Sequence, residues 1–125
     1  MPRLKFPKTH RVRKRQDYSA VFESRMRVSR GPLAMHGVLN ALGYTRLGLS
    51  TPRRVGIAVR RNRIRRLLRE SFRLLQHELP AGYDLVLVIR PHVPLALDEY
   101  QRLMRALVTA LDANWQRKAG SNFSE

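Results

Sequence analysis

The feature that most constrains this chain is a segment that is apolar along one side and rich in arginine along the other. Over a helix expected from about Arg61 to Glu78 and into the next residue, apolar residues recur at the spacing of one helical face, namely Ile64, Leu67, Leu68, Phe72, Leu75 and Leu79. Arginines spaced by four form a row beside that face, namely Arg61, Arg65, Arg69 and Arg73. Pro80 and Gly82 end the pattern. It predicts a helix that packs one side into protein and presents guanidinium groups to solvent.

The charge of the whole chain predicts a polyanionic partner. Its 125 residues include 25 Lys and Arg against 9 Asp and Glu, a net charge of +16. Such a charge makes a compact domain repel itself unless a partner neutralises it. Arginine outnumbers lysine, and its planar fork binds phosphate through paired hydrogen bonds and stacks on bases. This favours nucleic acid over a membrane surface.

Several classes of protein are disfavoured. The chain has no cysteine, which excludes disulfides, thiolate nucleophiles and cysteine-ligated metal sites. No apolar run reaches the roughly 18 residues of a membrane span, and the basic N-terminus lacks the apolar core of a signal peptide. We therefore expect a cytoplasmic protein without a membrane partner.

The remaining patterns predict a single α+β domain over residues 16–116. We expect a basic, extended arm over 1–15, a short helix over 16–24, strands over 33–42 and 46–50 with a hairpin loop at 40–44, a buried strand over 83–90, and a helix over 97–115. Residues 53–59 suit either a strand or a loop that enters the basic helix. The polar residues 117–125 are expected to be a disordered tail.

Catalytic signatures are absent. The histidines lie at no metal-ligand spacing, at His10, His36, His77 and His92. Asp98 and Glu99 are adjacent and point apart on a helix, and no glycine-rich phosphate loop or nucleophile elbow occurs. A nuclease normally needs metal-binding carboxylates or an acid–base pair, so we expect no catalytic residue, no metal and no cofactor held by this chain.

Aromatic side chains on the first helix allow two interpretations. Tyr18 and Phe22 share a face, so they either pack in the core or form a platform on which unpaired bases stack. His36, on the following strand, could extend such a platform.

These motifs resemble one known family. RLGLS, RRVGIAV and RNRIRRLLRESFR, followed by QHELPAGYDLVLVIRP, are similar to the signature region of the bacterial ribonuclease P protein subunit, and the resemblance spans roughly residues 4–115. It implies the order α-β-β-β-α-β-α with a left-handed crossover around the basic helix. It also implies that an RNA partner, using magnesium, hydrolyses the 5′ leader from precursor tRNA.

The resemblance also implies two sets of contact residues. The catalytic RNA subunit would bind residues of the basic helix, namely Arg60, Arg61, Asn62, Arg63, Arg65, Arg66, Arg69 and Arg73. The precursor-tRNA leader would lie along a second set, namely Arg11, Arg13, Tyr18, Phe22, His36, Arg53 and Arg54. The chain departs from the family at His36, where some members have another aromatic residue, and at Ile57, where the family often has Asn.

Two other functions compete with this interpretation. A structural RNA-binding protein of the ribosomal type would bind RNA without any effect on leader removal. A DNA-binding regulator could place the basic helix in a major groove, but it would need a dimer or a helix-turn-helix partner, and neither is evident, so no DNA partner is expected.

Overall fold

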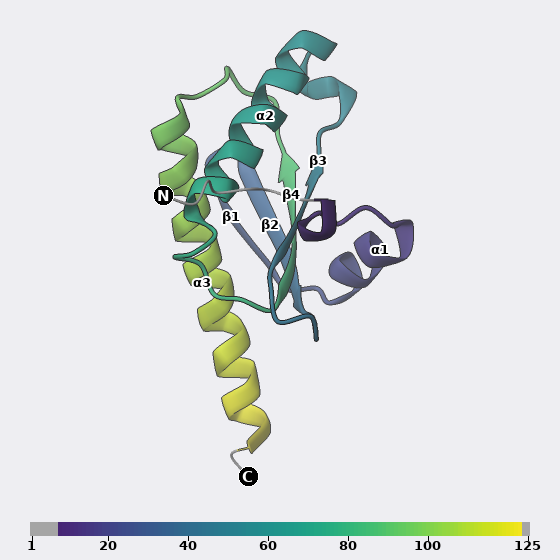
Figure 1. The fold of residues 1–125 in the computed structure, drawn as a ribbon, viewed down its shortest axis with the longest axis vertical. Helices are drawn as coiled ribbons and strands as arrows, with labels where there is room; N and C mark the ends of the chain where they lie inside the picture. Colours follow the sequence, from purple (N-terminus) through teal and green to yellow (C-terminus); the bar gives the residue numbers. More distant parts are fainter. Residues whose placement is uncertain (1–7, 124–125) are drawn as a thin grey trace.

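The computed structural model describes residues 8–123, whose elements follow the expected order α-β-β-β-α-β-α (Figure 1). The helices are α1 (Arg15–Glu23), α2 (Ala58–Leu75) and α3 (Leu97–Phe123), and the strands are β1 (Arg27–Arg30), β2 (Leu33–Leu39), β3 (Arg46–Ser50) and β4 (Tyr83–Ile89). Short 3₁₀ turns cover Lys8–His10 and Arg53–Val55. The predicted α+β class is confirmed.

The four strands form one mixed sheet in the order β1-β2-β4-β3. β1 pairs antiparallel with β2 across a tight turn in which Gly31 has a φ of +57°, a conformation that glycine adopts without strain. β2 is antiparallel and β3 parallel to β4. The sheet is therefore built around β4, whose uninterrupted apolar run suits a strand covered on both faces.

One sequence prediction about the strands is wrong, and the choice left open for residues 53–59 is decided in favour of the loop. The loop over 40–44 does not close a hairpin, because β4 lies between β2 and β3. Nor is 53–59 a strand, since a 3₁₀ turn and Gly56 lead into α2 at Ala58. The third early strand is β1, whose sequence RVSR has a single apolar residue. Local patterns fail here because strand pairing is decided by residues far apart in the chain.

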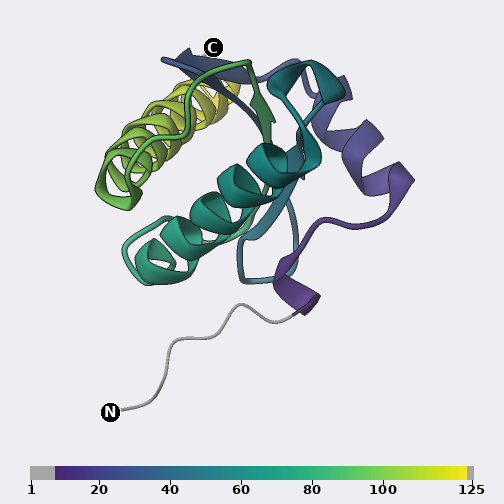
Figure 2. The same ribbon diagram turned by 90° about the horizontal axis from the view of Figure 1, so that it is seen from above.

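The connection from β3 through α2 to β4 is a left-handed crossover. Both strands point the same way, and from the side of α2, with the strands pointing upward, β4 lies to the left of β3 (Figures 1 and 2). Right-handed crossovers are the rule for such units, so this topology is a distinctive property of the fold. It confirms the crossover expected from the resemblance.

Within residues 8–123, helices cover both faces of the sheet, with α1 on one face and α2 and α3 together on the other (Figure 2). The main core lies under α2 and α3 and contains fully buried side chains from both helices and from β2 and β4, among them Leu33, Met35, Ile64, Leu68, Phe72, Leu85, Leu87, Tyr100, Met104 and Leu111. This packing turns the opposite side of α2 to solvent.

Near both ends of the described range, 8–123, the chain has more regular structure than expected. The backbone N–H of Val12 donates to the carbonyl of Leu47 at 3.0 Å, and the Val12 side chain is 3% exposed. Residues 8–12 of the expected basic arm therefore lie against the edge of the sheet; residues 1–7 lie outside the described residues. α3 runs to Phe123 instead of ending near Trp115, which contradicts a disordered tail over 117–123. The helix formers Gln116, Arg117, Lys118 and Ala119 explain the extension, and 124–125 lie outside the described residues.

Candidate nucleic-acid interface

The polar residues on the solvent side of α2 form two groups that differ in exposure. Arg60, Asn62, Arg63 and Arg66 are exposed, whereas the row Arg61, Arg65, Arg69 and Arg73 is half-buried beside the packed face. We call these eight residues the α2 arginine surface. Because α2 makes 3.6 residues per turn, side chains spaced by four form a row that runs slightly obliquely along the helix. The members of this row lie at the border between the packed face and solvent. All eight predicted residues are thus on one element and accessible to a partner.

Two members of the row also contact protein. The Nε of Arg61 donates to the carbonyl of Gly56 at 3.1 Å. Arg73 forms an ion pair and hydrogen bonds with Glu70. This contact lowers the pKa of Glu70, because the guanidinium stabilises the carboxylate. Glu70 is the one acid on α2, and it pairs with Arg73.

The N-terminal segment adds a further arginine to α2. Arg11 lines an open hollow of about 520 Å³ together with Asn62, Arg65, Arg66, Arg69, Glu70 and Arg73. Burial lowers the pKa of Arg69, and the positive charges of Arg65 and Arg11 lower it further. The fold therefore concentrates like charges from two distant segments of the chain.

A second hollow connects α2 with the side of the sheet that α1 covers. It measures about 270 Å³ and shares Arg11, Arg65 and Arg69 with the first, while Arg13, Tyr18 and Gly48 line its other walls. Arg11 was predicted to contact the leader, yet the structure places it at the junction of both hollows. The sequence could not show this, because the position of Arg11 depends on the pairing of its segment with β3.

Phe22 and His36 form an aromatic pair on the α1 face. Their ring centroids are 4.8 Å apart in an edge-to-face arrangement, and Phe22 is 40% exposed. Phe22 is therefore not a core residue, whereas Tyr18 is half-buried over the sheet. Burial, and secondly the charge of Arg27, lowers the pKa of His36. The lowered pKa favours the neutral imidazole, which can stack or exchange hydrogen bonds with a base.

The predicted leader residues do not all converge. The structure groups Arg11, Arg13 and Tyr18 around the second hollow, and it pairs Phe22 with His36. Arg53 and Arg54 are exposed on the 3₁₀ turn before α2 and line neither of these hollows.

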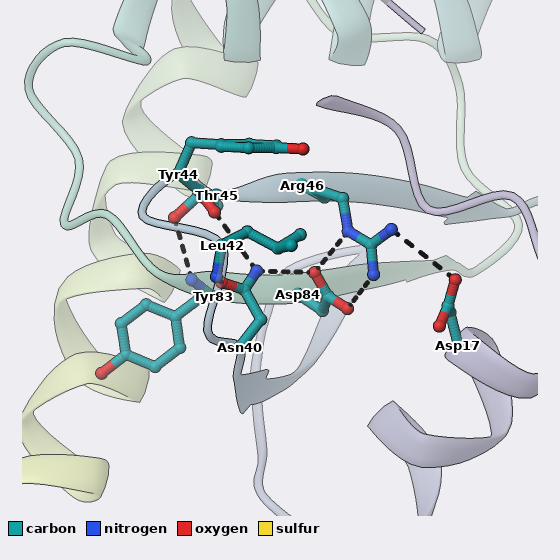
Figure 3. A network of polar contacts seen from close by, with 8 residues as sticks. All are labelled: Asp17, Asn40, Leu42, Tyr44, Thr45, Arg46, Tyr83 and Asp84. Carbon is teal, nitrogen blue, oxygen red and sulfur yellow. Dashed lines mark hydrogen bonds and ion pairs between the residues drawn. The ribbon is translucent and has the colours of Figure 1, made fainter. Parts of the chain in front are cut away.

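A polar network that sequence reasoning missed fixes the edge of this interface (Figure 3). Arg46 on β3 donates to both carboxylate oxygens of Asp84 on β4, at 2.8 and 2.5 Å. Asn40 donates to the same carboxylate at 2.8 Å, and Asp17 of α1 lies 3.6 Å from Arg46. The network ties α1 and the β2–β3 loop to the sheet. The one sequence feature that pointed to this network is Asp84, an acid next to the apolar run of β4.

Other kinds of site find no support in the part of the chain that the structure describes. Within residues 8–123, no three His, Asp or Glu side chains gather as metal ligands would. In the same range, no helix has the length and apolar character that crossing a membrane requires.

Comparisons with known proteins converge on one family. The family model described as Ribonuclease P matches residues 6–115. The ribonuclease P protein component of Escherichia coli is 42% identical over 118 residues, which are 94% of this chain and 93% of that protein. The corresponding protein of Edwardsiella ictaluri is 40% identical with the same coverage.

Solved structures agree in fold. The RNase P protein from Thermotoga maritima is 26% identical and superposes with a TM-score of 0.72, covering 78% of this chain and 94% of that one. A mutant RNase P protein from Staphylococcus aureus has a TM-score of 0.76 at 21% identity, covering 84% and 90% of the two chains. At that identity, the second likeness speaks for the fold alone.

Proposed function

The chain belongs to the ribonuclease P protein family, and we propose that its α2 arginine surface binds the catalytic RNA subunit while its α1 face holds the 5′ leader of precursor tRNA. Membership makes it the protein component of an endoribonuclease that processes tRNA. It also disfavours a ribosomal-type protein with no role in tRNA processing. The proposal concerns which surface meets which RNA.

The observation that carries the first assignment is the hollow in which Arg11 joins the arginines of α2. Arginines gathered this closely, with Glu70 as the one acid lining the hollow, repel one another, and a row of phosphates offsets that repulsion while it releases counterions. Phosphate contacts position RNA without reading its sequence. A folded RNA with closely spaced phosphates therefore fits the α2 arginine surface.

The second assignment rests on Phe22, whose ring is exposed on the face that α1 covers. Exposed aromatic rings stack unpaired bases of any sequence, and a neutral His36 beside Phe22 extends the platform. Arg11 and Arg13 supply cations at the hollow beside Tyr18. This combination suits a single strand whose sequence differs between precursors.

In this assignment the RNA subunit carries out the hydrolysis with its magnesium ions, and the protein positions the substrate. Guanidinium groups near the phosphates of both RNAs reduce their mutual repulsion. The protein would then lower the magnesium concentration that cleavage requires, without supplying a nucleophile.

The direct test is a precursor-tRNA cleavage assay with the protein, with the RNA subunit, and with both, over a range of magnesium concentrations. We expect no cleavage by the protein alone and cleavage at lower magnesium when both are present. Cleavage by the protein without any RNA subunit would overturn the division of labour.

Two variants separate the two surfaces. Phe22→Ala should weaken binding of precursor tRNA to the assembled enzyme more than binding of mature tRNA, because only the precursor carries a leader. Arg66→Gln should weaken binding of the RNA subunit and reduce the salt dependence of that binding by about one unit of slope. Equal losses for both tRNAs in Phe22→Ala, or an unchanged slope in Arg66→Gln, would remove that residue from its surface.

A further inference from the structure

A pair of stacked rings lies beside the N-terminal segment, on residues that neither proposed surface includes. The ring centroids of His10 and Tyr44 are 4.4 Å apart with planes tilted by 38°, and both side chains are half-buried. His10 ends a 3₁₀ turn and Tyr44 lies in the β2–β3 loop. They meet because the N-terminal segment is hydrogen-bonded along β3.

Tyr44 lies between two hollows of different character. The first, of about 200 Å³, is mostly cationic and is lined by Lys8, Thr9, Arg11, Arg13, Lys14, Asp17, Tyr44 and Arg46. Its one acid, Asp17, pairs with Arg46. The second, of about 220 Å³, combines apolar walls with polar groups and is lined by His10, Gly43, Tyr44, Thr45, Phe72, Gln76, His77, Leu79, Pro80 and Ala81.

The loop that carries Tyr44 is held in place by several hydrogen bonds (Figure 3). The side-chain amide of Asn40 donates to the carbonyl of Tyr44 at 3.2 Å and to Asp84 at 2.8 Å. The hydroxyl of Thr45 donates to the carbonyl of Pro80 at 2.8 Å. The ring is therefore carried on a backbone that needs little further ordering when a ligand binds, which favours affinity.

We propose that Tyr44 and His10 stack an unpaired RNA base while Lys8, Arg13 and Lys14 hold the flanking phosphates. The site would take a single-stranded ribonucleotide segment, because aromatic rings beside a cationic groove are the features that bind single strands without regard to sequence. An acidic peptide would use the cations but would gain little from the stacked rings.

The site is continuous with the hollow beside Tyr18, because both hollows are lined by Arg11 and Arg13. A strand leaving that hollow could pass along the N-terminal segment to Tyr44. The inference rests on RNA binding by the family but not on the assignment of α2. The strand could belong to the precursor leader or to the catalytic RNA, which offer the same chemistry, and the experiment distinguishes them.

The test compares Tyr44→Leu, Tyr44→Trp and the wild-type full chain in two binding assays. The first measures affinity for the RNA subunit alone, and the second measures affinity of the assembled enzyme for precursors with short and long leaders. We expect Tyr44→Leu to lower one of these two affinities by about fivefold or more. Tyr44→Trp should keep both affinities within about twofold of wild type, because tryptophan also stacks bases. A loss on the RNA subunit assigns the strand to that RNA, whereas a loss only with long leaders assigns it to the precursor.

A charge variant tests the phosphate contacts independently. Lys14→Gln should reduce the salt slope of the affected binding by about one, whereas Lys118→Gln should not; Lys118 is on α3, where its ammonium lies 5.0 Å from the ring centroid of Trp115. Surface changes of this kind leave the fold intact, so they remain informative even if a Tyr44 variant fails to fold.

Two results would overturn the inference: wild-type affinity of Tyr44→Leu in both assays, or equal losses in Tyr44→Leu and Tyr44→Trp. In the first case, a slope change in Lys14→Gln would indicate a purely electrostatic surface. Arg66→Gln, measured in parallel, reports on the proposed function separately, so a failure at Tyr44 does not affect the assignment of α2.

Discussion

The phenolic oxygen of Tyr18 lies 2.7 Å from the position that a β-carbon on Gly48 would occupy. Gly48→Ala should therefore displace the Tyr18 ring, which is the far end of a movable side chain, and leave the sheet in place. We expect a small change in stability and weaker binding of precursor tRNA to the assembled enzyme. Thermal denaturation and precursor affinity, measured on the same variant, check both parts.

Gly120→Ala is the matched control, because nothing lies within 4 Å of a β-carbon at that position on α3. There the change should stabilise the helix by up to about 1 kcal/mol and leave precursor binding unaltered. Wild-type precursor affinity in Gly48→Ala would show that Tyr18 does not contact the leader.

Arg69→Gln should separate stability from RNA binding. Burial and the charges of Arg65 and Arg11 disfavour the Arg69 guanidinium in the free protein. Removing it should leave the free energy of unfolding unchanged or raise it, while affinity for the RNA subunit falls. Denaturation in low salt and RNA titration supply the two readouts. A clear loss of stability would instead assign Arg69 a structural role in holding α2.

Asp84→Asn should destabilise the fold. Asp84 is 6% exposed, and its carboxylate accepts hydrogen bonds from Arg46 and Asn40, so neutralising it leaves Arg46 poorly paired. We expect a loss of about 2–3 kcal/mol in denaturant unfolding. Glu78→Gln is the control, because its ion pair with Arg105 is solvent-exposed, and it should cost no more than about 0.5 kcal/mol. Similar losses in both variants would contradict a special role for the Asp84 network.

His36→Phe should make stability less dependent on pH. Burial lowers the pKa of His36 in the folded chain, so the unfolded chain takes up the proton first as the pH falls. The stabilising contribution is present above the ordinary histidine pKa of about 6.5 and is lost at lower pH. The decline in denaturation midpoint from about pH 7.5 to 5.5 should be shallower in His36→Phe and in His36→Gln. A wild-type decline in both variants would show that His36 does not contribute to it.

Much of the α2 surface could be predicted from the sequence because a helix places residues by fixed geometry. Once Ile64, Leu68 and Phe72 define the buried face, the exposure of Arg66 and Asn62 follows from 3.6 residues per turn. The handedness of the crossover and the assignment of each RNA to a surface were predicted from the resemblance to the family. Hydrophobic periodicity alone predicts neither of them.

The rest depended on contacts between distant segments. No local pattern places Arg11 beside Arg65 and Arg69, joins Arg46 to Asp84, or stacks His10 on Tyr44. Each arises because the N-terminal segment pairs with β3 and because β4 enters the sheet between β2 and β3. The sequence by itself therefore determined which helix carries the positive charge, since charge and periodicity are local. Only the tertiary structure decided which charges and rings share a surface, since that depends on pairing across the whole chain.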